Sequence, residues 1–107
     1  MDGGSTPLFI AAEEGHEAVV RALIELGADI NKARDDGATP LFIAAPNDHE
    51  AVVRALIELG ADINKSEKNG VTPLIVGALL GHEAILQALI EAGADVNEAY
   101  HSCQTPM

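Results

Sequence analysis

One repeat length constrains this chain more than any other feature of its sequence. The pair Thr-Pro recurs at a fixed interval of 33 residues, beginning at Thr6, Thr39, Thr72 and Thr105. A histidine and a glycine keep the same interval: His16, His49, His82, Gly27, Gly60 and Gly93. A sustained period of this length is typical of arrays whose units stack on their neighbours. We therefore predict a single repeat array, and its units are residues 6–38, 39–71 and 72–104, with a partial fourth at 105–107.

Each unit is predicted to hold two helices. The threonine can cap a helix by accepting a free backbone N–H, and proline fits the first helical position because it has no N–H to satisfy. In the first unit we predict helices over residues 8–14, ended near Gly15, and 17–26, followed by Gly27 in a left-handed C-cap. In the second unit Pro46 is expected to shorten the first helix.

The second helix of each unit carries few polar residues. In the first unit they are Glu17, Arg21 and Glu25, whose spacing of four lets both glutamates pair with the arginine. The rest of the helix is apolar, so it needs burial on most sides. A helix of this length is marginal alone, which predicts that its neighbours stabilise it.

Composition excludes several classes of function. The chain has 17 acidic and 6 basic residues and a formal net charge of -11, which disfavours a phosphate backbone or an anionic membrane as partner. No apolar run approaches the ~20 residues that span a bilayer. A lone cysteine, Cys103, excludes an internal disulfide framework, and no signal peptide is visible. We therefore expect an intracellular, cytoplasmic protein.

The repeated motifs resemble those of the ankyrin repeat family. Each unit combines the Thr-Pro-Leu start with a corner histidine and the exit Gly-Ala-Asp-(Ile/Val)-Asn, and the likeness covers residues 2–107. It implies an all-α solenoid of stacked helix-turn-helix units with protruding β-turns or hairpins. Two positions depart from the family pattern. The usual histidine after Thr-Pro-Leu is Phe9, Phe42 or Ile75, and the corner glycine of the second unit is Asp48.

The resemblance also implies a non-enzymatic scaffold that binds a protein through a concave face made by turn tips and first-helix ends. On this sequence those positions are Ser5, Glu13, Glu14, Asp35, Asp36, Ala38, Pro46, Asn47, Lys68, Asn69, Val71, Leu79, Leu80, His101 and Gln104. Their character changes along the array from acidic to apolar. This predicts a partner with basic groups at one end and apolar groups at the other.

The near-identity of the first two units leaves an alternative open. The chain could be a designed, consensus-like or excised array without an evolved ligand. The same identity means that the first unit should expose an apolar set that the second unit buries. We therefore predict that the ends of the array can stack on another copy.

No stretch of the sequence predicts a catalytic, cofactor or metal site. His16, His49 and His82 lie one unit apart, and packed helices are about 8–10 Å apart, whereas zinc needs nitrogens at about 2.0–2.1 Å. We expect these histidines to brace the corner between helices and turn. His101 beside Cys103 remains an alternative site for opportunistic metal binding.

Two further alternatives concern acidic and asparagine residues. The pairs Glu13-Glu14 and Asp35-Asp36 are expected in solvated positions, which do not suit acid–base catalysis. A loose calcium site in the acidic turns stays open, although the regular ligand spacing of a calcium loop is missing. The family resemblance implies that an asparaginyl hydroxylase could modify the exit asparagines, which are Asn31, Asn64 and Asn97.

Overall fold

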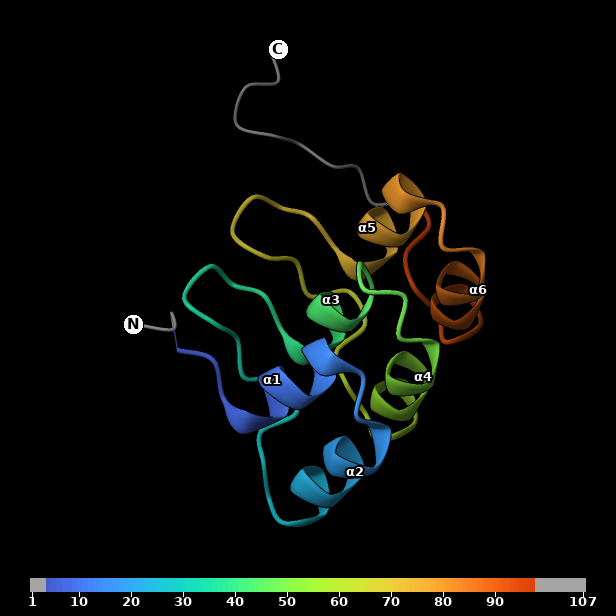
Figure 1. Ribbon diagram of the computed structural model, residues 1–107. Helices are drawn as coiled ribbons and strands as arrows, with labels where there is room; N and C mark the ends of the chain where they lie inside the picture. The colour runs from blue at the N-terminus through green and yellow to red at the C-terminus, as the bar shows by residue number, and fades with distance from the viewer. Residues whose placement is uncertain (1–3, 98–107) are drawn as a thin grey trace.

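The helices of the computed structural model come in pairs, one pair in each repeat unit (Figure 1). The structure describes residues 4–97. Its helices are α1 (Pro7–Glu14), α2 (Glu17–Glu25), α3 (Pro40–Ala44), α4 (Glu50–Glu58), α5 (Pro73–Leu80) and α6 (Glu83–Glu91). Residues 4–97 contain no strand, so the predicted all-α array of stacked helix pairs is confirmed. The predicted start of a fourth unit lies outside the described residues.

The first helix of each unit starts as the Thr-Pro motif predicts. Proline occupies the first turn, and the preceding threonine accepts from the amide three residues on. The pairs are Thr6 with Phe9 (3.1 Å), Thr39 with Phe42 (3.2 Å) and Thr72 with Ile75 (3.2 Å). Such a bond satisfies one of the free N–H groups at the helix start and stabilises the fold by about 1 kcal/mol.

The ends of the first helices follow the local residues. Gly15 caps the C-terminal end of α1 and Gly81 that of α5, both in the left-handed conformation, with φ of 81° and 73°. In the second unit Pro46 follows the end of α3, which has only five residues, and the predicted shortening is confirmed. Asp48 then takes the left-handed position with φ of 58°. Aspartate tolerates this conformation better than most residues because its short polar side chain bonds locally.

A tight turn connects each unit to the next. The N–H of Gly37 donates to the carbonyl of Arg34 at 2.8 Å, and that of Gly70 donates to Glu67 at 3.0 Å. These are four-residue β-turns, and one further bond, from Arg34 N–H to Ala38 O, closes the first turn at its base. The loops that carry the turns project beyond the row of α1, α3 and α5 (Figure 1).

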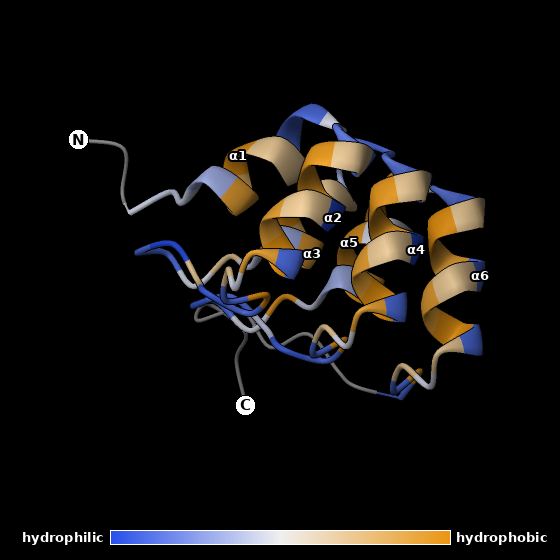
Figure 2. Cartoon of the chain, turned by 90° about the horizontal axis from the view of Figure 1, so that it is seen from below, coloured by the Kyte–Doolittle hydropathy of each residue, from blue (hydrophilic) through white to orange (hydrophobic). Residues whose placement is uncertain are grey.

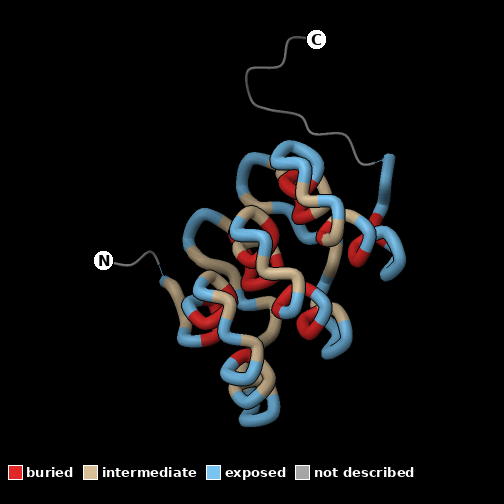
Figure 3. Tube along the Cα trace, turned by 45° about the vertical axis from the view of Figure 1, so that its right-hand side comes forward, coloured by how far each residue is buried: buried red, intermediate tan, exposed pale blue. Residues whose placement is uncertain are grey.

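The six helices form two layers with the core between them. α1, α3 and α5 form one row, and α2, α4 and α6 form the other, which we call the outer row. Each helix contacts its neighbour in the row (Figure 2). The buried residues lie on the facing sides of the rows (Figure 3) and are mainly Ala, Leu, Ile and Val. Among the described residues no helix combines the length and the apolar character that a membrane span requires.

Candidate functional site

The two described turn tips, residues 34–37 and 67–70, lie against each other. The backbone N–H of Lys68 donates to the carbonyl of Asp36 at 2.9 Å. Gly37 permits this close approach, because its φ is 87° and an added Cβ would lie 2.8 Å from the Lys68 nitrogen. The exposed tip residues predicted for the site therefore form one continuous surface, which comprises Asp35, Asp36, Lys68 and Asn69.

A carboxylate organises the backbone of each turn. Asp36 accepts a hydrogen bond from the N–H of Ala38 at 3.0 Å. In the next unit Glu67 accepts from the N–H groups of Asn69 and Val71, at 2.7 and 3.1 Å. The two turns thus keep similar shapes with different side chains. Glu67 was not among the predicted site residues, and its acidic character two residues before Asn69 was the only signal for it.

Arg34 connects the first turn to the first helix. Its guanidinium lies 2.6 Å from the Asp36 carboxylate and 4.6 Å from the centre of the Phe9 ring. The hydrogen bond to Asp36 raises the pKa of Arg34, and the charge of nearby Glu13 adds to it. The hydrogen bond from Arg34, followed by the Ala38 amide, lowers the pKa of Asp36. Turn and helix end therefore belong to one surface at this point.

The ends of the first helices differ sharply between units. The first unit presents Glu13 and the exposed Glu14, whereas the third presents Leu79 and Leu80, which are 69% and 53% exposed. In the second unit the same positions hold half-buried Pro46 and an exposed asparagine, Asn47. The predicted change from acidic to apolar is therefore present among exposed side chains.

The structure contradicts the prediction that Ala38 belongs to the binding surface. Its side chain is only 1% exposed, because the closed turn folds it beneath the tip, next to the buried Thr39. It is not available to a partner. Val71, at the same position of the next unit, is half-buried. The predicted site residues His101 and Gln104, and Cys103 with its metal alternative, lie outside the described residues.

The histidines connect neighbouring units. We expected these histidines to brace the corner between helices and turn, and the bond that the ring of His49 makes runs to the preceding unit, to the carbonyl of Glu13 at 2.9 Å. In the same way His82 reaches the carbonyl of Pro46 at 3.2 Å, and lies 3.7 Å from the Asp48 carboxylate. They join helix ends one unit apart. Within residues 4–97, no three side chains of the metal-ligating types gather in one place.

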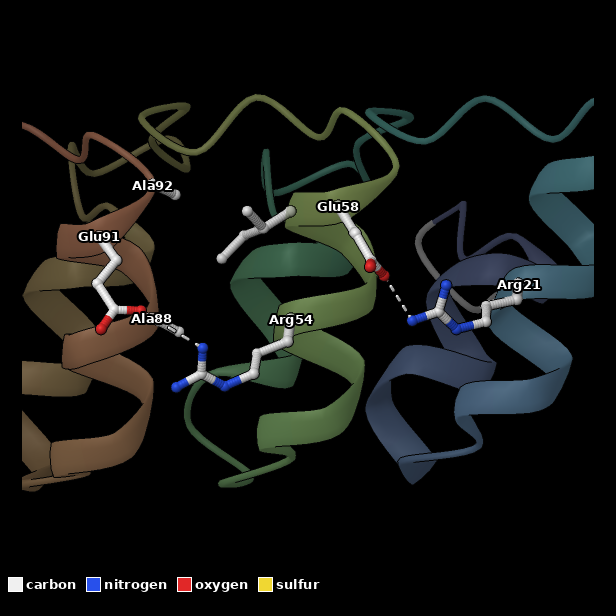
Figure 4. Close-up of a pocket in the computed structure, with 7 residues that line it drawn as sticks. Arg21, Arg54, Glu58, Ala88, Glu91 and Ala92 are labelled. Atoms are coloured by element: carbon white, nitrogen blue, oxygen red, sulfur yellow. Dashed lines mark hydrogen bonds and ion pairs between the residues drawn. The ribbon is translucent and has the colours of Figure 1, made fainter.

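A groove of about 480 Å³ crosses the outer row of helices. Its apolar lining comes from Ile57, Ala88 and Ala92. Arg21 points to Glu58 at 2.7 Å and Arg54 to Glu91 at 3.6 Å, so the ion pairs cross from helix to helix (Figure 4).

These ion pairs correct one prediction. Arg21 does pair with Glu17 at 2.9 Å, but its second partner is Glu58 of the next unit and not Glu25. The hydrogen bonds that Arg21 donates to Glu58 and then to Glu17 raise the pKa of Arg21. Both arginines that line the groove are already paired by carboxylates. The turn and first-helix surface, in contrast, presents Glu14 and Lys68 without side-chain partners in the described part of the chain.

A comparison with protein families gives a match over nearly the whole chain. A family model described as ankyrin repeats (3 copies) matches residues 1–67 and 32–100. No curated protein matches the sequence.

Proposed function

Because the chain belongs to the ankyrin-repeat family, we propose that it is a non-enzymatic module that binds a protein partner through its turn tips and first-helix ends. Ankyrin repeats are generally protein–protein interaction modules. The proposed surface comprises Glu13, Glu14, Asp35, Asp36, Pro46, Asn47, Lys68, Asn69, Val71, Leu79 and Leu80. We retain His101 as a candidate on the basis of its sequence position alone.

One observation carries this proposal: the neighbouring leucines Leu79 and Leu80 are both largely exposed. The corresponding positions of the other units hold Glu13, Glu14 and Asn47, together with a proline. Adjacent exposed leucines are a cost to a monomer unless another surface covers them, and contiguous apolar surface marks interaction sites. The leucines therefore favour contact with an apolar part of the partner.

Charge favours a basic group at the other end of the surface. The chain carries a net charge of -11, and Glu14 and Asp35 are exposed on the first helix end and the first turn. Asp36 is already paired with Arg34, so it contributes less charge to a partner. A partner with lysines or arginines opposite Glu14 and Asp35 would associate faster at low salt, because exposed charges steer encounter.

The test is capture of partners from a lysate of the source organism, with the wild-type chain and two variants immobilised in parallel. The double variant Leu79→Ala with Leu80→Ala should lose the captured partner. Leu26→Ala is the matched control, because Leu26 is 84% exposed but follows α2 in the outer row. We expect the control to retain the partner, and 0.5 M salt to weaken capture. Capture that is the same for all three chains and unaffected by salt would contradict the proposal.

A second candidate rests on the sequence identity of α2 and α4, which share all nine residues. Identical outer helices fit an array that was designed, derived from a consensus or excised, and that has no evolved ligand. The capture experiment separates the two candidates. If the array has no evolved ligand, every protein that the wild-type chain captures should also be captured by the double leucine variant.

A further inference from the structure

The contacts between neighbouring units repeat along the array with the same atoms. The ring Nε2 of His49 lies 2.9 Å from the carbonyl oxygen of Glu13. One unit further on, the ring Nε2 of His82 lies 3.2 Å from the carbonyl oxygen of Pro46. Each histidine therefore reaches back to the end of the first helix of the unit before it.

A second contact runs in the opposite direction. The side-chain oxygen of Asn31 accepts a hydrogen bond from the backbone N–H of Asp62 at 2.8 Å. The side-chain oxygen of Asn64 accepts from the N–H of Asp95 at 3.0 Å. Each asparagine therefore reaches forward to the unit that follows it.

The two outer faces of the described array carry the hydrogen-bonding groups of these contacts without their partners. On the first unit, the ring of His16 and the N–H of Asp29 have no partner within residues 4–97. On the third unit, the carbonyl of Leu79 and the side chain of Asn97 have none in the same range. If the internal contacts continued past the array, His16 would pair with a carbonyl equivalent to that of Leu79, and the N–H of Asp29 with a side chain equivalent to that of Asn97.

The first-unit face also exposes apolar groups that an internal unit buries. Val19 of α2 is 48% exposed, whereas Val52 of α4, in the same nine-residue sequence, is fully buried. Beside it lies a hollow of about 220 Å³, which is lined by Thr6, Pro7, Leu8, Leu23, Ala28, Asp29 and Lys32. Pro7 is exposed and Leu23 half-buried here, whereas their second-unit counterparts Pro40 and Leu56 are buried.

The third-unit face exposes apolar groups that would pack against the hollow and the exposed apolar groups of the first-unit face. Ile90 and Val96 are 50% and 59% exposed. Their counterparts Ile57 and Ile63 pack against the core of the array, where the following unit adjoins them. The two faces lie at opposite ends of the rows of helices (Figure 2).

We propose that a second copy of this chain stacks on the first end to end, so that the third unit of one copy covers the first unit of the next. The interface keeps the 33-residue register of the internal ones: His16 bonds to the Leu79 carbonyl, and Asn97 accepts from the N–H of Asp29. A second copy fits the first-unit face because its third unit carries both the apolar residues and the hydrogen-bonding groups that this face leaves without partners. Such an interface is not self-complementary, so it continues to further copies. This inference does not depend on the proposed function.

Salt should promote this assembly. Each copy carries a net charge of -11, so two copies repel one another at long range. The contacts that join them are apolar groups and hydrogen bonds between uncharged groups, which salt screens little. At about 0.15 M ionic strength the screening length falls to about 8 Å. We therefore expect assembly to strengthen between low and physiological salt, the opposite of the salt effect expected for binding a basic partner.

The experiment is sedimentation velocity of the full chain over a concentration series, with one variant for each face. Val19→Glu places a charge in the first-unit interface, and Ile90→Glu places one in the third-unit interface. Both side chains are about half exposed in the isolated array, so circular dichroism should be unchanged. The wild-type chain should grow beyond a dimer as concentration rises, whereas each variant alone should stay monomeric.

Mixing the two variants gives the sharpest test. Val19→Glu keeps an intact third-unit face and Ile90→Glu an intact first-unit face, so the mixture should form dimers and stop there. The matched control is Leu80→Glu, because the positions of Glu14, Asn47 and Leu80 are exposed in all three units and lie outside the interface. This control should assemble like the wild type.

A milder variant guards against loss of folding. His16→Ala removes a single interfacial hydrogen bond, and should weaken assembly roughly fivefold. A wild-type chain that remains monomeric throughout the series would overturn the proposal. Dimers formed by either glutamate variant alone, or a mixture that stays monomeric, would overturn it equally.

Discussion

At the scale of the residue, the site depends on positions where the backbone leaves little choice of side chain. Gly37 illustrates this: it has a positive φ, and the turn of the next unit passes close to it. The approach lets Lys68 donate to Asp36 and joins the two turn tips. Gly60 also has a positive φ, of 100°, but no heavy atom would lie within 4 Å of its added Cβ.

We predict that Gly37→Ala destabilises the chain more than Gly60→Ala. Both substitutions force a left-handed conformation on alanine, which costs about 1–2 kcal/mol. Only at Gly37 does the new methyl group also collide with backbone, and such overpacking costs a further ~1–3 kcal/mol. The free energies of unfolding in urea measure the difference. Equal losses for the two variants would show that the turn tips do not need their close contact.

At the scale of the element, α2 and α4 show how strongly the burial of a helix depends on its position in the array. Both have the sequence of Glu17–Glu25, yet α4 has four buried residues and α2 has one. The difference arises because α4 has a neighbour on each side within its row, α2 and α6, whereas α2 has only α4 in that row among the described residues. Burial, and not intrinsic propensity, therefore sets the contribution of each helix.

This leads us to expect different outcomes for the same substitution in the two helices. Leu56 is fully buried, and Leu56→Ala should destabilise the chain by about 2–5 kcal/mol through lost burial and a cavity. Leu23 occupies the same position of α2 and is only half-buried, so Leu23→Ala should cost clearly less. Chemical denaturation of the two variants makes the comparison. A larger loss at Leu23 would be incompatible with the packing described.

At the scale of the whole molecule, local signals in the sequence predicted the units well and the contacts between them poorly. Thr-Pro predicted each helix start, and Pro46 the short α3, because these effects act within a few residues. The bond from His49 to Glu13 and the pairing of Arg21 with Glu58 were missed. A period along the chain sets the length of a unit but not the lateral offset between stacked helices.

The candidate surface shows the same division. Exposure of the turn tips and of Leu79 followed from their polar or variable positions, whereas the burial of Ala38 did not. That burial depends on how the closed turn folds back on Thr39, which needs the bond between Arg34 and Ala38. Arg34 itself was missed because its contacts with Phe9 and Asp36 depend on the path of the turn.

At every scale, each helix pair is stabilised by the units stacked against it. The most direct test is amide hydrogen exchange of α2 and α4 in the same chain, at a concentration where it is monomeric. The two helices share one sequence, so their intrinsic exchange rates are closely similar and differences in protection report their surroundings. We predict that the amides of α4 exchange at least roughly tenfold more slowly than those of α2, a difference of about 1.4 kcal/mol. Equal protection of the two helices, or stronger protection of α2, would contradict it.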